Sequence, residues 1–202
     1  MAVAVEWEVI QMRRRGARSV QAMLVLVISV LMMASTGSLA TGDEVTVRDN
    51  LRRDAGGPLD LAAVSHGHRG ARLVHTLRTY EPWRGRWLRG RTNNIQLTFD
   101  RQDGGQHRVE RVLAVDYFEG ELIARMLNVT GDRIRVVGYA KIERPHRRIL
   151  TLVFPQRLLK RREFDAYRWG AYVFYAGPGC ESYCGDEIPR SGAPRILHDL
   201  AS

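Results

Sequence analysis

The sequence contains very little cysteine: Cys180 and Cys184 are the two in 202 residues. Two thiols alone cannot supply the four ligands of a structural zinc site, so a site built only from cysteines is excluded. Two further signatures are missing, the Gly-x-Ser-x-Gly turn that presents a nucleophilic serine and a glycine-rich phosphate-binding loop. No motif of a known reaction is therefore found in the sequence. Its composition, charge and apolar pattern limit the classes of function that it can have.

Long hydrophobic runs are also scarce, because residues 22–34 form the one such run and it lies near the N-terminus. This run is shorter than the roughly 20 residues that a membrane-spanning helix needs. It follows arginines and ends in small residues before Ala40, which predicts a secretory signal peptide cut between Ala40 and Thr41. The residues before Met12 include Glu6 and Glu8, whereas a signal peptide begins with a basic segment. We therefore expect translation to start at Met12. An uncleaved anchor is the alternative. We expect a secreted protein with no stable membrane anchor after cleavage.

Lysine is the third scarce residue, since Lys141 and Lys160 are the two lysines among 31 basic residues. The formal net charge is +9. An arginine bias of this kind is typical of a G+C-rich genome, and the arginines are dispersed along the chain. We therefore expect no nucleic-acid partner. Weak attraction to acidic cell-wall polymers fits the charge of a secreted protein better.

The pattern of apolar residues predicts four segments: a signal peptide over 1–40, a polar leader over 41–57, a β domain over 58–176 and a disulfide-pinned tail over 177–202. Strands are predicted over 59–65, 73–80, 95–99, 109–118, 122–129, 134–142, 149–154 and 167–176. Such regular short strands favour an all-β fold, an antiparallel β-sandwich or jelly roll that follows an N-terminal signal helix. Short helical turns are expected within residues 83–88 and 155–161.

The two cysteines lie four positions apart in a glycine-rich segment. In an oxidising compartment the simplest expectation is a disulfide between Cys180 and Cys184. Because the closed loop is so short, its entropic stabilisation falls at the low end of the usual range. The bond would pin a C-terminal turn. A redox-active pair is the alternative, although such pairs favour Cys-x-x-Cys at the start of a helix.

Three carboxylates, Asp49, Asp54 and Asp60, mark the passage from the polar leader into the first predicted strand. Calcium takes about six to eight oxygen ligands and tolerates irregular loops, so these aspartates are a candidate calcium site. Residues 56–58 are Gly-Gly-Pro, which would let the backbone turn between Asp54 and Asp60. The alternative is that the aspartates start turns and solvate the leader.

Two sets of residues near the ends of the mature chain carry a specific pattern: 48–49, 54, 57–61, 64–68 and 73–80 near one end and 180–184, 186, 189, 192 and 198 near the other. With these two segments as its most specific parts, most of the mature chain resembles a family of secreted proteins of high-G+C bacteria. The chain is more distantly similar to carbohydrate-binding sandwich modules, although it lacks their tight Gly-Asp-Asp loop. The resemblance implies an all-β sandwich without an assigned activity, and it carries over no catalytic residue.

Three histidines, His66, His68 and His75, form a second candidate metal site. In a strand, His66 and His68 face the same side. If residues 69–70 form a two-residue hairpin loop, Val64 pairs with His75 and all three imidazoles share one face. Three imidazoles bind zinc and leave a position for water. The alternative is that they are hydrogen-bonded polar positions at a sheet end or surface.

Trp83 and Trp87 lie in an arginine-rich segment at a spacing that one helical turn would place on one side. Exposed, they would stack on sugar rings; buried, they would cover an open end of the core. The leading hypothesis is a non-catalytic secreted β-sandwich that binds a glycan or cell-envelope component and takes calcium at its leader. The alternatives are a secreted hydrolase that uses zinc or a carboxylate pair, and a structural or inhibitory module that acts on another protein.

Overall fold

The computed structural model describes residues 44–49, 57–90, 92–101, 109–159, 166–190 and 196–199. The predicted signal peptide, its cleavage site between Ala40 and Thr41, and the candidate ligand Asp54 lie outside these residues. The described strands are β1 (Val45–Arg48), β2 (Leu61–Arg69), β3 (Arg72–Thr79), β4 (Asn94–Arg101), β5 (Val109–Phe118), β6 (Glu121–Thr130), β7 (Arg133–His146), β8 (Ile149–Pro155), β9 (Ala166–Gly177), β10 (Cys180–Ile188) and β11 (Ile196–Asp199).

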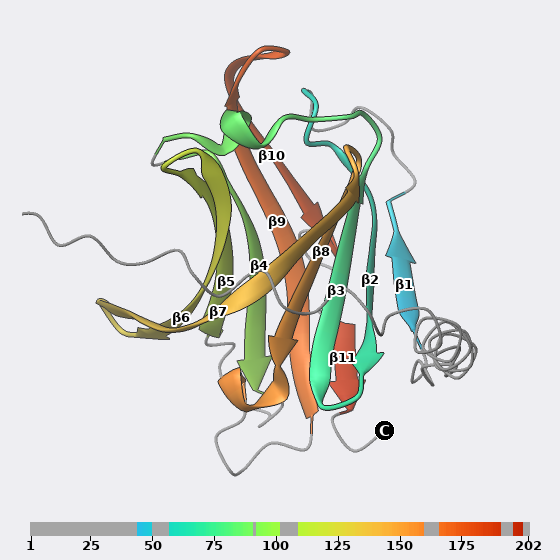
Figure 1. The fold of residues 1–202 in the computed structure, drawn as a ribbon, viewed down its shortest axis with the longest axis vertical. Helices are drawn as coiled ribbons and strands as arrows, with labels where there is room; N and C mark the ends of the chain where they lie inside the picture. Colours follow the sequence, from blue (N-terminus) through green and yellow to red (C-terminus); the bar gives the residue numbers. More distant parts are fainter. Residues whose placement is uncertain are drawn as a thin grey trace, which may run out of the picture. The chain divides into compact units, whose positions relative to one another are not determined.

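The predicted all-β antiparallel class is confirmed. The helical elements among the described residues are two short 3₁₀ turns, η1 (Gly85–Leu88) and η2 (Gln156–Leu158), which fall inside the two stretches where helical turns are predicted. The strands run in the order β1-β2-β3-β8-β7-β6-β5-β4-β9-β10, and β11 pairs with β9 (Figure 1). All of the pairings are antiparallel, and β10 also contacts β2, so the sheet is nearly closed.

β7 joins the two halves of this sheet. Its first part, up to Ala140, pairs with β6, and its second part, from Lys141, pairs with β8. In Figure 1, β7 crosses in front of β4 and β8 crosses in front of β9, and ring contacts such as Phe99–Phe154 show that the two halves face one another. The facing layers expected of a sandwich are therefore two parts of one continuous sheet, linked by a single strand of 14 residues.

The core fills the space between the facing halves. Alternate residues of each strand point inward, as the period-two pattern of a half-buried strand requires. Buried aliphatic and aromatic side chains from both halves include Val64, Leu73, Leu77, Ile95, Leu97, Phe99, Leu113, Val115, Met126, Leu152, Phe154, Trp169 and Val173. Two histidines, His66 and His75, share this interior.

The β2–β3 hairpin has a different register from the one that the sequence predicts. Arg69 pairs with Arg72, so the two-residue loop is Gly70-Ala71, and His66 pairs directly with His75 in place of Val64. The physical reason is that Gly70 adopts a positive φ of 60°, which the first loop position of a tight hairpin needs. The imidazoles of His66 and His75 still share one face, because the register moves by two residues.

Three strands lie in segments that the sequence analysis treats as a leader and a tail. β1 falls in the polar leader, where it pairs with β2, while β10 and β11 fall in the C-terminal segment and both pair with β9. In β1 only Val45 and Val47 alternate with polar residues, which is too short a pattern to predict a strand. β10 is rich in charged and small residues, so it has no strand pattern either. These strands are recognisable from their partners rather than from their own composition.

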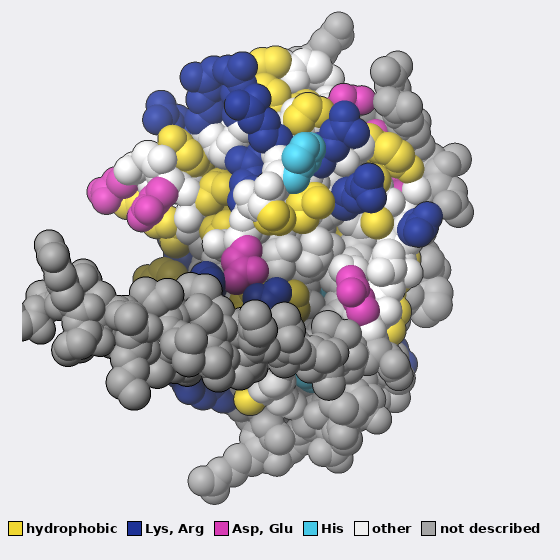
Figure 2. Space-filling view, turned by 45° about the vertical axis from the view of Figure 1, so that its right-hand side comes forward, with side chains coloured by type: hydrophobic (Ala, Val, Ile, Leu, Met, Phe, Trp, Pro, Cys, Tyr) yellow, Lys and Arg dark blue, Asp and Glu magenta, His cyan; other side chains and the backbone are white. Residues whose placement is uncertain are grey.

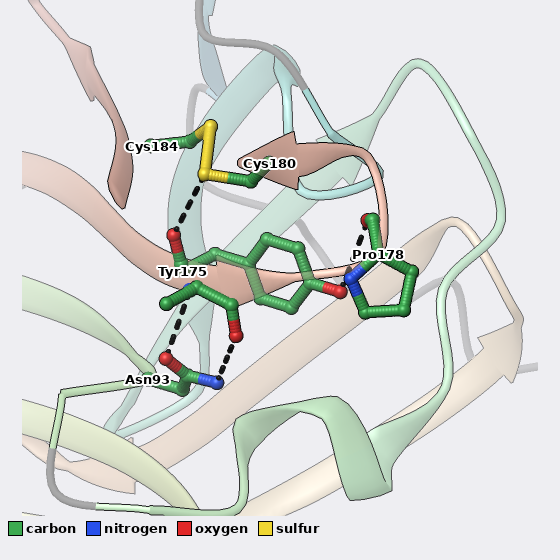
Figure 3. Close-up of a disulfide and its surroundings, with 6 residues drawn as sticks. Asn93, Tyr175, Pro178, Cys180 and Cys184 are labelled. Carbon is green, nitrogen blue, oxygen red and sulfur yellow. Dashed lines mark hydrogen bonds between the residues drawn. A yellow bond between two sulfur atoms is a disulfide. The ribbon is translucent and has the colours of Figure 1, made fainter. Parts of the chain in front are cut away.

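The predicted disulfide between Cys180 and Cys184 is confirmed at the start of β10, with the two Cα atoms 5.9 Å apart. Figure 3 shows how it joins the neighbouring strand: Sγ of Cys180 lies 3.3 Å from the carbonyl oxygen of Tyr175. The Tyr175 hydroxyl donates to the carbonyl of Pro178, and Asn93 bonds both backbone groups of the next residue in β9. The bond therefore fixes the turn between β9 and β10, in agreement with its predicted role.

Candidate functional site

Three aspartates, Asp49, Asp60 and Asp186, meet where β1, β2 and β10 come together. One carboxylate oxygen from each lies within 4.8 Å of the other two. Asp49 follows β1, Asp60 precedes β2 and Asp186 lies within β10. The structure thus brings together two of the three predicted calcium ligands and adds Asp186. Metal ligands in proteins are usually acidic, histidine or cysteine side chains. Among the described residues, Asp49, Asp60 and Asp186 are the three such side chains whose ligand atoms all lie this close together.

Backbone hydrogen bonds hold the three aspartates in place. The amide of Asp49 donates to Ala62, which extends the pairing of β1 with β2 by one residue. The amide of Leu61 donates to Oδ2 of Asp186 at 2.5 Å, and this bond connects β10 to β2 across 125 positions of sequence. The Tyr80 hydroxyl donates to the carbonyl of Asp49 at 2.6 Å. The carboxylates therefore sit on a preformed framework of strands.

The electrostatics of this aspartate group favour a cation. Asp49 and Asp60 are buried, and Asp60 is only 2% exposed. Arg190 approaches from one side, with Nη2 3.2 Å from Oδ1 of Asp49, although its own side chain is 47% exposed. Closely spaced carboxylates repel one another strongly where water is excluded, so a positive charge among them is favourable. Carboxylate oxygens are the ligands that calcium prefers.

The histidines lie inside the core. His66 and His75 are 1% and 0% exposed, and Nδ1 of His66 lies 3.0 Å from Nε2 of His75, a hydrogen-bond distance. The Tyr167 hydroxyl lies 3.3 Å from His66, and burial raises the pKa of this phenol well above its usual value. His68 lies farther out, with its ring centre 6.0 Å from that of His66. Burial lowers the pKa of His68.

Aromatic side chains complete the surroundings of the two buried imidazoles. The ring of His75 stacks against Phe154 and meets Trp169 edge to face. This geometry matches the alternative that the sequence left open, in which the histidines are hydrogen-bonded polar positions. They occupy the interior instead of a sheet end, because the observed pairing sets His66 and His75 directly opposite each other on the inward face.

The two candidate tryptophans pack against the upper end of the core. Trp83 is 1% exposed, and the Arg144 guanidinium lies over its ring at 3.8 Å from the ring centre. Trp87 is half-buried, with its ring centre 6.3 Å from that of Tyr175. Trp83 therefore has no face open to a sugar ring. Its placement corresponds to the core-packing alternative, because Trp83 precedes η1 and turns inward.

A groove of about 670 Å³ runs over the outer face of β1, β2, β3 and the start of β8. The residues that line it are Thr46, Arg48, Asp49, Ala62, Ala63, Ser65, Thr76, Arg78, Thr79, Tyr80, Arg148 and Ile149. Sequence reasoning missed this groove, because its lining residues come from four separate stretches whose register decides which of them are neighbours. The one sequence signal was the recurrence of small hydroxyl residues at outward strand positions.

Comparison with protein-family models, with curated proteins and with solved structures finds no match for this chain. Within the part of the chain that the structure describes, no helix has the length and apolar character needed to cross a bilayer.

Proposed function

We propose that the protein is a secreted, non-catalytic binding protein built on a sandwich-like β domain, and that calcium stabilises it. Its ligand is an extracellular glycan or a cell-envelope component. The observation that carries this proposal is the convergence of Asp49, Asp60 and Asp186 at the junction of three strands. A calcium ion there would join the first strands of the domain to β10 and neutralise buried negative charge.

The groove beside the aspartate group supports a binding function. Asp49 belongs to both, so an ion that orders the end of β1 also orders one wall of the groove. The zinc-dependent hydrolase gains no comparable support, since His66 and His75 face an aromatic interior. We therefore favour binding over hydrolysis.

The calcium proposal is tested by thermal unfolding of the purified protein in calcium and in chelator. Because the ion binds the folded state, calcium at about 100 times its Kd would add about 2.7 kcal/mol of stability. For a chain of this size that corresponds to a rise in Tm of roughly 5–10 °C. Asp60→Asn removes one ligand and should abolish most of the rise.

Asp132→Asn is the matched control, because Asp132 is an exposed acid in the β6–β7 turn, away from the aspartate group. It should keep the full calcium response. Equal melting curves in calcium and chelator, or an equal loss of response in both variants, would contradict the proposal.

The export proposal is tested separately by sequencing the N-terminus of protein recovered from the culture medium. The expected first residue is Thr41. Recovery of the chain only from the cell membrane, with residues 12–40 still attached, would favour the uncleaved anchor instead.

A further inference from the structure

A row of hydroxyl side chains crosses the outer face of the sheet. Reading from strand to strand, the paired hydroxyl residues are Thr46 of β1, Ser65 of β2, Thr76 of β3 and Thr151 of β8, and the next residue across, Glu143 of β7, carries a carboxylate. The hydroxyls of Thr76 and Thr151 lie 3.0 Å apart. Neighbouring strands are about 4.8 Å apart, so the row offers hydroxyl groups at the spacing of adjacent strands. The first three of its members line the groove.

A row of arginines runs parallel to the hydroxyls. Arg48 pairs with Ala63, and Ala63 pairs with Arg78, so two guanidinium groups flank a floor made by one small side chain. Two strand spacings separate the two arginines, about 10 Å between backbones. Arg148, next to the start of β8, also lines the groove. The arginine and hydroxyl rows are two residues apart along each strand, which is about 7 Å.

The three arginines are available to a ligand. Among the described residues, the side chains of Arg48, Arg78 and Arg148 have no hydrogen-bond or ion-pair partner. The one acid in the lining, Asp49, is buried and accepts a hydrogen bond from Arg190. Figure 2 shows this side of the molecule, with arginine and lysine side chains gathered over its upper part. The groove is therefore positively charged at one wall and neutral along its floor.

We propose that this groove binds a carboxylated polysaccharide, a chain of uronic-acid type, laid along the two rows. This inference rests on the proposed binding function and names its ligand class. Arginine pairs with carboxylates through two parallel hydrogen bonds, and small hydroxyl side chains exchange hydrogen bonds with sugar hydroxyls. Among the lining residues Tyr80 is the single aromatic, and its hydroxyl is engaged by Asp49. Single-stranded nucleic acid would need several stacking surfaces.

The inference is tested by titrating the purified protein with a short oligogalacturonate in a calorimeter, in calcium-containing buffer. Arg48→Gln and Arg78→Gln each remove a charge-assisted contact from an exposed strand position and should weaken binding about tenfold. Ser65→Ala removes a neutral hydrogen bond and should weaken it about threefold. A neutral xylo-oligosaccharide should bind at least tenfold more weakly than the acidic chain.

Arg135→Gln is the matched control, since Arg135 is an exposed strand arginine in the β6–β7 hairpin, outside the groove. It should leave the affinity within about twofold. Equal weakening by Arg135→Gln and Arg78→Gln would show attraction to net charge only and would overturn the proposal. The proposal would also be overturned if a single-stranded oligonucleotide bound as tightly as the acidic sugar and lost affinity in the same arginine variants.

The test separates this inference from the proposed function. If the neutral sugar binds as tightly as the acidic one and Arg78→Gln has no effect, the ligand class is wrong while a glycan-binding protein remains. If neither sugar binds, the inference is overturned, and the calcium melting experiment decides the stabilising ion independently. A flat calcium response together with arginine-dependent sugar binding would remove the calcium proposal and keep this one.

Discussion

The aspartate group and the histidine group make an instructive comparison, because the sequence offers both as metal sites and the structure draws members of both together. The aspartates meet at an edge where strands from the two ends of the domain join, with an arginine beside them. His66 and His75 meet in the interior, against Phe154 and Trp169. Short distances between ligand-type side chains are common to both groups. Their surroundings differ.

What differs is how each group satisfies its own polar atoms. The two imidazoles face each other at hydrogen-bond distance in an aromatic core, and the Tyr167 hydroxyl lies 3.3 Å from His66, so these groups can bond to one another. Three carboxylates cannot satisfy one another, because each only accepts hydrogen bonds when it is ionised. Carboxylates that face one another need a cation or a donor between them, whereas a neutral imidazole carries both a donor and an acceptor nitrogen and can therefore bond to a second imidazole. The comparison predicts opposite responses to mutation and to metal.

The largest effect is expected from the histidine group. His75→Ala opens a cavity between the halves of the sheet and removes one hydrogen-bond partner of His66, which should cost about 3 kcal/mol of unfolding free energy. Urea denaturation measures this loss. His146→Ala, at the exposed β7–β8 turn, is the control and should change stability by less than about 0.5 kcal/mol. If zinc stabilised the native protein but not His75→Ala, the structural interpretation of the histidines would be wrong.

The second effect concerns the disulfide that anchors β10. Replacing both Cys180 and Cys184 with serine frees a short loop and should lower the unfolding free energy by about 2 kcal/mol. Because Asp186 follows Cys184 by two residues, the replacement should also weaken calcium binding severalfold. Calorimetric titration with calcium checks this. An unchanged calcium affinity would mean that the bond to Leu61 alone positions Asp186.

The third effect isolates Arg190. In chelator, Arg190→Gln removes the positive charge beside Asp49 and should lower stability by about 1 kcal/mol, a modest value because the guanidinium is half exposed. In calcium the ion supplies the charge, so the same substitution should have a smaller effect. The calcium-dependent rise in Tm therefore grows in the variant. A rise that shrinks instead would indicate that Arg190 helps to bind the ion.

The smallest effect on stability is expected from Glu143, whose carboxylate forms ion pairs with Arg69 and Lys141. Hydrogen bonds from Lys141 and then from Arg69 lower its pKa below the usual 4.5. The folded state therefore releases this proton more readily than the unfolded chain, so the stabilisation is present above pH 4.5 and is lost as the pH falls through the lower, folded-state value. Glu143→Gln should flatten the acid end of the stability profile slightly. An unchanged profile would show that the ion pairs of Glu143 contribute no measurable stability.

The fold class could be predicted because the strands carry local signals. Alternation over Ile95 to Phe99 identified β4, and the turn at Glu119-Gly120 gave the end of β5 and the start of β6 to within a residue. The strands that carry the site were harder to recognise. β1 is short and polar, and β10 contains charged and small residues, so neither has a strong pattern of its own. Both segments form strands because they pair with a neighbouring strand, β1 with β2 and β10 with β9.

The candidate site could be predicted only in part, for the same physical reason. Asp49 and Asp60 are close in sequence, and the Gly-Gly-Pro sequence at 56–58 favours a turn before Asp60, so their approach could be anticipated. Asp186 reaches them only because the sheet curls until β10 contacts β2. The hydroxyl row depends on the register of several strands at once, and a single two-residue change, such as the one found in the β2–β3 hairpin, alters which residues are paired.

The hydrogen bond from Leu61 to Asp186 also sets an order of events. A chain is synthesised from its N-terminus, so Asp49 and Asp60 emerge long before the third aspartate, which lies 125 positions beyond Leu61. The loop that must close for this contact spans most of the domain, and such contacts form late in folding. The aspartate group is therefore assembled only when β10 has arrived, and a chain truncated before β10 has no complete site. On the calcium proposal, a chain that binds the ion at this place is one in which β10 has already joined the sheet.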